Sequence, residues 1–428
     1  MRSNSYLVEY FRTGSLFLIL GVGIIFYGCS SSDSPFQTSS GPSSVSGTVF
    51  ETPLEFDSGE NPISIVSGDF NGDNEIDLVV ASSRKQDGIS TTADGTLTLL
   101  QYSSSSNSRF PFVSSTINPT TEEWRQDLVS IDYSGDNFTD LVVTHTDDDK
   151  IKFLLNDGST NFIDNGSIDV GEVPLSIISG DWNNDNQTDL AVVNRDESSV
   201  SILQNSNGVF SLSQTLSVDE RPIRIVSGDW DADSDLDLAV LLRDSIQIQI
   251  WLNSGTGSFS KQSTSYSVGS SPIDMITGDW DCDDSLDLAV SNSGDDTISL
   301  IYGEGNGTFA SSVAISTGRG PGSMTSADFN NDNKMDFVVG HRFLVSTPGV
   351  ALLTGDFSLT LSDTSSATGY ASSVSFAATT EEDGAPPAEI IIIDADNDSK
   401  LDLLITLPLV KKLAVLFGNQ YTGSLTCP

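Results

Sequence analysis

The stretch Gly68-Asp69-Phe70-Asn71-Gly72-Asp73-Asn74-Glu75-Ile76-Asp77-Leu78 is the template for most of this chain. The intervals between successive copies are 63, 49, 48, 50, 49 and 66 residues, so the basic period is about fifty. A period of this length indicates one supersecondary unit that is stacked many times. In the two longest intervals we interpret residues 103–123 and 363–383 as loop insertions. The seven copies begin at Asp69, Asp132, Asp181, Asp229, Asp279, Asp328 and Asp394.

Each copy has the same order of predicted elements. A short apolar strand such as residues 63–66 precedes the acidic loop, and a second strand such as residues 78–81 follows it. A third strand alternates apolar and polar residues, as at 246–250, and a Gly-rich turn that ends in Phe leads to a fourth strand. A Pro lies seven residues before the first Asp in six copies, and only Arg125 breaks this rule. The six are Pro62, Pro174, Pro222, Pro272, Pro321 and Pro387.

A repeated four-stranded unit predicts an all-β chain folded as a seven-bladed β-propeller of four-stranded antiparallel blades. One small sheet cannot bury both of its faces alone, so such sheets pack around a common axis. The last copy ends before a fourth strand, and residues 47–62 have the pattern of the missing one. We therefore expect the N-terminal strand to complete the last blade, which removes two open sheet edges.

This order of strands, acidic loop and Gly-x-x-Pro turn resembles the FG-GAP/VCBS repeat family, which is also seen in integrin α-chain propellers. The resemblance extends from about residue 47 to residue 425. It implies a propeller and, by analogy with the integrin chains, a partner bound on the face opposite the acidic loops.

The acidic loops have the spacing of calcium sites. When the first Asp is numbered position 1, oxygen-bearing side chains fall at positions 1, 3, 5 and 9. Hard cations such as Ca²⁺ take six to eight oxygen ligands, and a backbone carbonyl at position 7 adds another. We predict up to seven structural Ca²⁺ ions, with the second site the weakest because its position 3 is Ser134. The alternative is a set of metal-free turns, which Asp and Asn also favour.

The predicted side-chain ligands are grouped by copy. They are Asp69, Asn71, Asp73 and Asp77; Asp132, Ser134, Asp136 and Asp140; Asp181, Asn183, Asp185 and Asp189; Asp229, Asp231, Asp233 and Asp237; Asp279, Asp281, Asp283 and Asp287; Asp328, Asn330, Asp332 and Asp336; and Asp394, Asp396, Asp398 and Asp402. The predicted carbonyl ligands are those of Glu75, Phe138, Gln187, Asp235, Ser285, Lys334 and Lys400. The aromatic residues at position 2 are interpreted as packing between blades rather than as a sugar-stacking platform.

The N-terminus carries a targeting pattern. An uncharged apolar run at 16–26 has the length of a signal-peptide core, and the sequence that ends in Gly28-Cys29 resembles a bacterial lipoprotein signal with Cys29 as the lipidated residue. An uncleaved anchor helix is the alternative. We expect residues 1–28 to be the signal peptide, 29–46 a flexible Ser-rich tether and 47–428 the propeller. The expected location is the bacterial envelope, anchored in the outer membrane.

The composition narrows the possible partners. With 60 acidic and 19 basic residues the formal net charge is −41, which disfavours nucleic acid and leaves the lipid anchor as the only expected contact with a membrane. The three cysteines, Cys29, Cys282 and Cys427, form no disulfide framework, and the pairing of the last two stays open. We expect a monomer.

A few basic residues follow the predicted second strands or lie in the Gly-x-x-Pro turns, on the face opposite the metal loops. A basic rim in an acidic protein could bind an anionic glycan or an acidic protein patch, although paired, solvated loop residues are the alternative. The candidate ligand-binding residues are Arg84, His145, Arg195, Arg243, Arg319, His341 and Arg342.

The leading functional hypothesis is a non-enzymatic binding or adhesion module for a protein or carbohydrate. A polysaccharide-modifying enzyme and a structural component of an envelope assembly are the alternatives. With only His145 and His341 in the chain, no catalytic constellation can be defended from the sequence.

Overall fold

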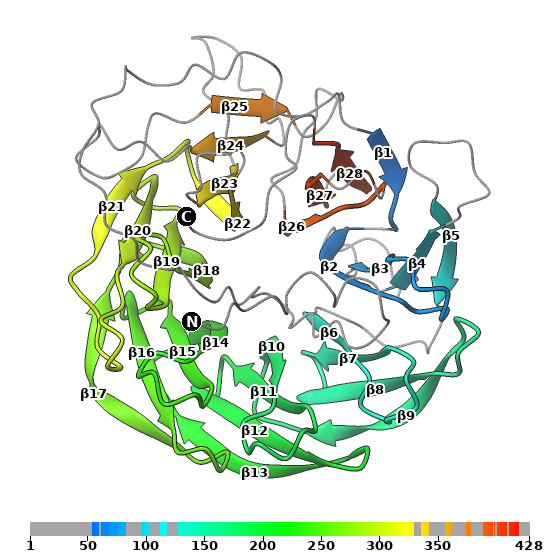
Figure 1. Ribbon diagram of the computed structural model, residues 1–428, viewed down its shortest axis with the longest axis horizontal. Helices are drawn as coiled ribbons and strands as arrows, with labels where there is room; N and C mark the ends of the chain where they lie inside the picture. Colours follow the sequence, from blue (N-terminus) through cyan, green and yellow to red (C-terminus); the bar gives the residue numbers. More distant parts are fainter. Residues whose placement is uncertain are drawn as a thin grey trace, which may run out of the picture.

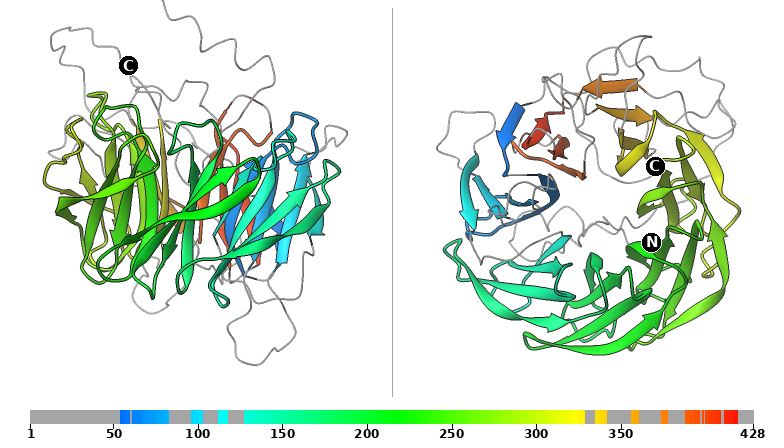
Figure 2. Two further views of the ribbon diagram at one scale, coloured as in Figure 1. Left: turned by 90° about the horizontal axis from the view of Figure 1, so that it is seen from below. Right: turned by 180° about the vertical axis from the view of Figure 1, so that it is seen from behind.

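The computed structural model describes residues 54–59, 61–82, 96–102, 112–117, 127–328, 335–341, 356–360, 374–377, 388–396, 398, 400–408 and 411–418. These residues form seven four-stranded antiparallel sheets arranged in a ring (Figure 1). The side and rear views show strands that run between the two faces of the ring (Figure 2). The described residues contain no helix with the length and apolar character needed to cross a bilayer.

Six of the sheets are blades that are continuous in sequence. Blade 1 contains β2 (Pro62–Gly68), β3 (Asp77–Ser82), β4 (Thr96–Tyr102) and β5 (Phe112–Ile117). Blade 2 contains β6 (Leu128–Ile131), β7 (Asp140–His145), β8 (Lys150–Asn156) and β9 (Phe162–Asp169). Blade 3 contains β10 (Pro174–Gly180), β11 (Asp189–Asn194), β12 (Ser199–Ser206) and β13 (Val209–Ser217).

The next three blades follow the same order. Blade 4 contains β14 (Pro222–Gly228), β15 (Asp237–Leu242), β16 (Gln247–Asn253) and β17 (Phe259–Ser267). Blade 5 contains β18 (Pro272–Gly278), β19 (Asp287–Asn292), β20 (Thr297–Ile301) and β21 (Val313–Ser316). Blade 6 contains β22 (Pro321–Ala327), β23 (Asp336–His341), β24 (Asp356–Thr360) and β25 (Val374–Ala377).

The seventh sheet is assembled from both ends of the described chain. It combines β26 (Ile390–Ile393), β27 (Asp402–Leu407) and β28 (Lys412–Leu416) with β1 (Leu54–Asp57), which pairs antiparallel with β28. Six blades, rather than seven, are therefore continuous in sequence, and the N-terminal strand completes the last sheet, as the sequence predicted. The seventh sheet, called the composite blade below, depends on a contact between residues more than 350 positions apart.

The prediction that residues 103–123 and 363–383 are loop insertions was wrong in part. The outer strands β5 and β25 lie inside these ranges. β5 has the sequence FVSSTI and its four central residues are exposed, so it lacks the apolar alternation that marks a half-buried strand. The edge position explains why sequence patterns missed it.

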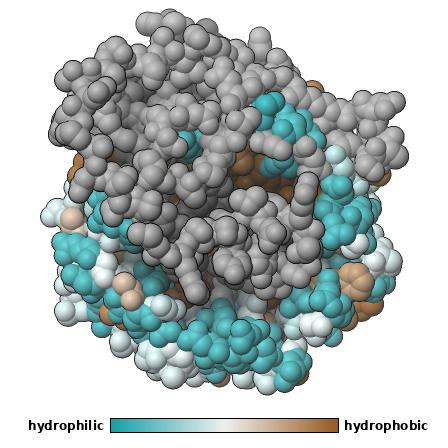
Figure 3. Space-filling model, viewed as in Figure 1, coloured by the Kyte–Doolittle hydropathy of each residue, from teal (hydrophilic) through white to brown (hydrophobic). Residues whose placement is uncertain are grey.

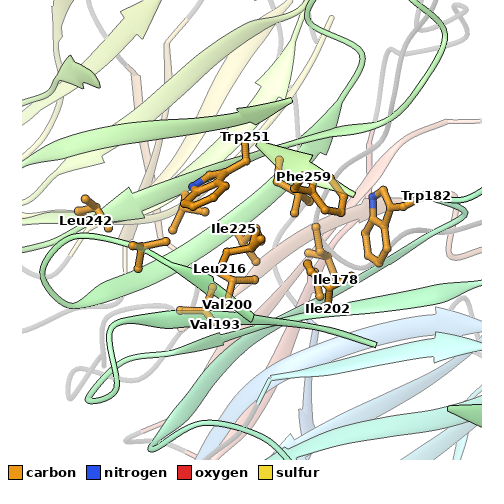
Figure 4. Packing of buried hydrophobic residues seen from close by; sticks show 14 residues of the cluster. Ile178, Trp182, Val193, Val200, Ile202, Leu216, Ile225, Leu242, Trp251 and Phe259 are labelled. Carbon is orange, nitrogen blue, oxygen red and sulfur yellow. The ribbon is translucent and has the colours of Figure 1, made fainter. Parts of the chain in front are cut away.

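Buried side chains from adjacent sheets form the core between blades. One cluster joins blades 3 and 4 and includes Ile178, Trp182, Leu216, Ile225 and Phe259 (Figure 4). Burial of apolar surface contributes about 25 cal/mol per Å² removed from water, so these interfaces are a main source of stability. Each sheet thus buries its two faces against its neighbours.

Each described Pro of the repeat is the first residue of an innermost strand, where no ladder hydrogen bond needs its missing N–H group. A register shift follows in each case, for example between Pro222 and Arg224. Such bulges re-aim a side chain. Here they lie where the innermost strands line the centre of the ring (Figure 1).

Candidate metal loops and axial ring

The acidic loops connect the first and second strands of each blade, as residues 69–76 connect β2 to β3. Their backbone turns twice through the left-handed region. Positions 4 and 6 have positive φ in blades 1 to 5, for example 76° at Gly72 and 65° at Asn74. Gly and Asn reach this region with little strain, which explains their frequency at these positions.

Ala232 occupies a left-handed position 4 with φ of 59°, and Gly135 occupies the equivalent position with φ of 77° and no atom within 4 Å of an added Cβ. We expect Ala232→Gly to stabilise the protein by about 0.5–1 kcal/mol and Gly135→Ala to destabilise it by about 1 kcal/mol. Urea unfolding in saturating calcium measures both. Equal midpoints for the two variants would show that this backbone geometry carries no strain.

The carboxylate at position 1 organises the turn. In blade 1, Asp69 Oδ1 accepts hydrogen bonds from the backbone N–H groups of Gly72 at 2.7 Å and Asp73 at 3.2 Å, while Oδ2 accepts one from Asn74 at 2.8 Å. Asp132 repeats the pattern in blade 2. A carboxylate that satisfies several backbone donors holds the loop closed before any metal binds.

The carboxylate at position 9 connects the loop to the third strand. Asp237 is fully buried; its Oδ2 accepts a hydrogen bond from the Trp230 N–H at 3.1 Å, and its Oδ1 accepts one from the Asn253 N–H at 2.8 Å. Burial is the largest cause of a raised pKa at this position, to about 7 for Asp237 and about 8 for Asp287. Without a cation, these carboxyl groups therefore lose part of their charge near neutral pH.

Positions 1, 3 and 9 converge in three loops. Their carboxylate oxygens lie within 4.8 Å of one another in blade 4, in blade 5 and in the composite blade, where position 3 is also Asp. The position 5 carboxylates are not members of these groups; Asp233 Oδ1, for example, accepts a hydrogen bond from the Asp235 N–H at 2.9 Å. The three groups are Asp229, Asp231 and Asp237; Asp279, Asp281 and Asp287; and Asp394, Asp396 and Asp402.

Two oxygens in these loops suit a cation. Asp189 is fully buried and its Oδ2 has no hydrogen-bond partner, and Asp231 Oδ1 is also buried without one. An unpaired buried carboxylate oxygen is costly, and a bound hard cation offsets that cost. The residues present therefore fit a divalent cation held by oxygen ligands. In blade 6, Asp328 and Asp336 are buried, whereas Asn330, Asp332 and Lys334 lie outside the described residues.

The aromatic residues at position 2 pack between blades, as the sequence predicts. Trp182 and Trp230 are 0% and 2% exposed, which leaves no face for a sugar. Each contacts the aromatic that follows the Gly-rich turn of the next blade, Trp182 with Phe259 at a centroid distance of 6.2 Å and Trp230 with Phe309 at 6.1 Å. Figure 4 shows Trp182 beside Phe259.

An axial ring, which the sequence analysis missed, occupies the centre of the propeller. It consists of the residue two places after the repeat Pro, or the equivalent residue, in each sheet. Arg224 of blade 4 contacts Asp274 of blade 5 at 3.0 Å and Asp127 of blade 2 at 3.5 Å. Blades 2 and 4 are not neighbours, so these side chains meet at the axis. The members are Ser64, Asp127, Ser176, Arg224, Asp274, Ser323 and Glu389.

Hydrogen bonds pass around this axial ring from blade to blade. Glu389 Oε2 accepts one from the Ile65 N–H at 2.6 Å, and Asp274 Oδ2 accepts one from the Met324 N–H at 3.0 Å. Asp127 Oδ2 likewise accepts hydrogen bonds from the Ile177 N–H and the Ser176 hydroxyl, both at 3.1 Å. The signal that could have revealed these residues is their constant spacing from the Pro.

The axial ring holds three carboxylates and one guanidinium. Burial raises the pKa of Glu389 to about 8, the Asp127 charge adds to the shift and Arg224 opposes it. Burial also raises the pKa of Asp127, again opposed by Arg224. Burial alone would lower the pKa of Arg224, but Asp274 and Asp127 outweigh it and the pKa is raised. Arg224 therefore stays charged and stabilises the surrounding carboxylates.

The predicted ligand-binding histidines do not lie on an open rim. His145 and His341 are 2% and 4% exposed, at the ends of β7 and β23. Burial lowers the pKa of His341 to about 4, so it is neutral at pH 7. Both side chains are too buried to contact a ligand on an open rim, which contradicts their assignment as ligand contacts, and Gly318 of the preceding turn lies against the His341 ring. Arg84 and Arg342 lie outside the described residues.

The predicted basic rim is acidic in the described turns of blades 2 to 6. The turns at 146–149, 170–173, 195–198, 218–221, 243–246, 268–271, 293–296 and 317–320 hold eleven acidic residues and four arginines. Backbone hydrogen bonds place these turns on one face, as from the Arg195 N–H to the Val173 carbonyl at 3.0 Å. Arg195 pairs with Asp196 at 2.7 Å and Arg221 with Asp244 at 3.7 Å, while Arg243 and Arg319 are exposed. We call this surface the acidic turn face.

Two further observations complete the described surface. Hydrophilic residues predominate along the described part of the rim in Figure 3.

Cys282, at position 4 of the blade 5 loop, is disulfide-bonded. Cys29 and Cys427 lie outside the described residues. Residues 1–53, which include the predicted signal peptide and tether, also lie outside them.

Comparison with known proteins agrees with this architecture. The FG-GAP-like repeat family matches four overlapping stretches, residues 132–192, 181–240, 229–290 and 279–339. No curated protein sequence matches the chain.

Solved structures show the same fold at low sequence identity. A crystal structure of BBS1N in complex with ARL6DN, soaked with mercury, is similar with a TM-score of 0.59 and 12% identity, covering 88% of this chain and 99% of that one. A putative 6-phosphogluconolactonase from Bacteroides uniformis has a TM-score of 0.51 and 10% identity, covering 73% of this chain and 84% of that one. These likenesses show a shared fold and no shared chemistry.

Proposed function

The chain carries FG-GAP-like repeats in a β-propeller, and from this premise we propose that it is a calcium-stabilised, non-enzymatic module that binds a protein partner. The observation that carries the metal assignment is the convergence of positions 1, 3 and 9, together with the unpaired oxygens of Asp189 and Asp231. The role of calcium is structural, because it ties each loop to the third strand of its blade.

Calcium is favoured over magnesium by the donor set. The loops offer carboxylate, amide and carbonyl oxygens from a flexible hairpin, and Ca²⁺ accepts six to eight such ligands in irregular geometry. Mg²⁺ demands near-ideal octahedral geometry and keeps much of its water. Native mass spectrometry during a calcium titration counts the filled sites, and binding of fewer than three ions would contradict the assignment.

The acidic turn face is the surface that we assign to the partner. Its exposed acidic residues outnumber its arginines, which suits a protein with a basic surface rather than an acidic glycan. The BBS1N propeller was crystallised in complex with another protein, ARL6DN, which adds support for a protein partner. No cluster of described residues favours an enzymatic alternative.

A photo-crosslinking residue at Glu172 or Glu197, both exposed on the acidic turn face, should capture one partner. The same residue at Thr256, which is exposed on the metal-loop side, is the matched control and should capture none. Capture should weaken in high salt, because charge pairs at an interface rim are screened. Equal capture from both faces, or binding to a glycan array instead, would contradict the proposal.

We also propose that the chain is exported and lipid-anchored in a bacterial envelope. The support is the apolar run at 16–26 followed by Gly28-Cys29 and a Ser-rich segment. A metabolic fatty-acid label should enter the protein and be lost in Cys29→Ser, while Cys282→Ser retains it. Labelling that survives Cys29→Ser would exclude this anchor.

A further inference from the structure

The metal loops of blades 3 and 4 touch through a side-chain hydrogen bond. Asn184 Nδ2 donates to Asp235 Oδ1 at 2.7 Å, and its second contact is the Gly255 carbonyl at 3.4 Å. Asn184 stands between two predicted ligands of the blade 3 site. Asp235 stands at position 7 of the blade 4 site, where the predicted ligand is its own carbonyl.

A second bridge joins the same two loops beneath the first. The Asn253 N–H donates to Asp237 Oδ1 at 2.8 Å, and its side-chain Nδ2 donates to the Trp182 carbonyl at 2.8 Å. Asp237 is the position 9 ligand of blade 4, and Trp182 directly follows Asp181, the position 1 ligand of blade 3. One buried Asn therefore contacts a ligand of one site and the residue beside a ligand of the other.

Neighbouring pairs of loops lack this double link among the described residues. At the boundary of blades 2 and 3, the equivalent of Asn184 is Gly135, and an added Cβ there would meet no atom within 4 Å. At the boundary of blades 1 and 2, Asn156 Nδ2 donates to the Phe70 carbonyl at 2.7 Å, but the partner of the upper bridge is Gly72, which has no side chain. The unpaired carboxylate oxygens of Asp189 and Asp231 belong to the linked pair.

We propose that the sites of blades 3 and 4 bind divalent cations cooperatively through the Asn184–Asp235 and Asn253 bridges. This inference rests on the proposed calcium binding. A cation in the blade 4 loop orders Asp235 and Asp237, and the two bridges transmit that order to Asn184 and Trp182. The blade 3 loop then loses less conformational freedom when its own cation binds, so its affinity rises. By linkage, the effect is the same in the opposite direction.

The test reads the blade 3 site alone with terbium, a hard cation whose luminescence is excited through a nearby Trp. Trp124, Trp230, Trp251 and Trp280 are replaced by Phe, so that Trp182 is the one remaining Trp and reports on the adjacent site. Asp231→Ala weakens the blade 4 site. We expect this change to raise the terbium concentration for half-saturation at blade 3 about fivefold, the low end of typical coupling between sites.

Asn184→Gly removes the upper bridge without backbone strain, because Asn184 has φ of 58° and Gly occupies this position in blades 1 and 2. In that background we expect Asp231→Ala to change the blade 3 half-saturation less than twofold. Asn186→Gly is the matched control, since Asn186 has φ of 62° in the same loop and its side chain forms no hydrogen bond with the described residues of blade 4. There the fivefold effect should persist.

The outcomes separate the two proposals. Saturable terbium binding that is insensitive to Asp231→Ala, or equally sensitive in the Asn184→Gly and Asn186→Gly backgrounds, overturns the coupling and leaves the metal sites standing. Absence of any saturable signal through Trp182 overturns the metal assignment and the coupling with it.

Discussion

We expect the melting temperature of the calcium-loaded protein to fall by about 20 °C when a chelator removes the metal. A site filled at a hundred times its Kd contributes about 2.7 kcal/mol, and the contributions of up to seven sites add when all bind only the folded state. With an unfolding entropy of about 2.1 cal/mol/K per residue, 1 kcal/mol shifts the Tm of a propeller of this size by about 1 °C.

Differential scanning calorimetry with and without chelator measures this loss. Sodium chloride at matched ionic strength is the control, because a net charge of −41 is itself relieved by screening. Magnesium at the calcium concentration should restore only part of the loss. A melting temperature that chelation leaves unchanged would refute the metal assignment.

The calcium effect should also grow with pH. Burial raises the pKa of Asp77 and Asp402 to about 7, so in the metal-free protein their contribution to stability is present below pH 4 and is lost as pH rises toward 7. Calcium requires the deprotonated form and offsets that loss. The difference in Tm between loaded and chelated protein should therefore be larger at pH 8 than at pH 5.

The second large effect is expected from Arg224→Met in the axial ring. The substitution keeps an unbranched apolar stem but removes the guanidinium, which leaves Asp127, Asp274 and Glu389 without a cation. Removal of one partner from a buried charge cluster costs about 3–5 kcal/mol. Arg243→Met is the control. Arg243 is exposed and makes no ion pair with the described residues, so its replacement should cost less than about 0.5 kcal/mol.

The Arg224→Met deficit should grow as pH rises above 8, because the variant keeps losing stability up to its higher Glu389 pKa, whereas the loss in the wild type levels off near 8. The pKa of Glu389 is already raised to about 8 in the presence of Arg224, and loss of the guanidinium raises it further. A carboxyl group with a raised folded-state pKa contributes stability below its unfolded pKa and loses it as pH rises. Denaturant unfolding at several pH values, with calcium saturating, tests this. A pH-independent deficit would mean that packing, not charge, is what Arg224 provides.

The repeat and its acidic loops could be predicted from the sequence because they are local. Positions 1 to 9 lie within nine consecutive residues, and the hydrogen bonds that shape the loop, such as those to Asp69, span five residues or fewer. The alternation of apolar residues was equally local. The outer strand β5 escaped prediction because its four central residues are exposed and its sequence lacks apolar alternation.

The net charge of the turn face was hard to predict because it is a sum over many turns. The alternative that its arginines pair with neighbouring acidic residues agrees with the contacts of Asp196 and Asp244, and the burial of His145 and His341 had no signal in the sequence. The turns after the second strands and the turns before the first strands form one surface because backbone hydrogen bonds join them, as between Arg195 and Val173. The net charge of that surface depends on all of these turns together.

The sequence by itself determined the repeated unit, the strand order, the spacing of the acidic residues and the packing role of the position 2 aromatics, because each is written within one period of about fifty residues. Only the tertiary structure decided which residues meet across blades. Ring closure brings Arg224 to Asp127 of a non-adjacent blade and joins Asn253 to Trp182. The physical reason is that these contacts depend on how the sheets pack around the axis. Local patterns along the chain carry no information about which residues of different blades lie close together.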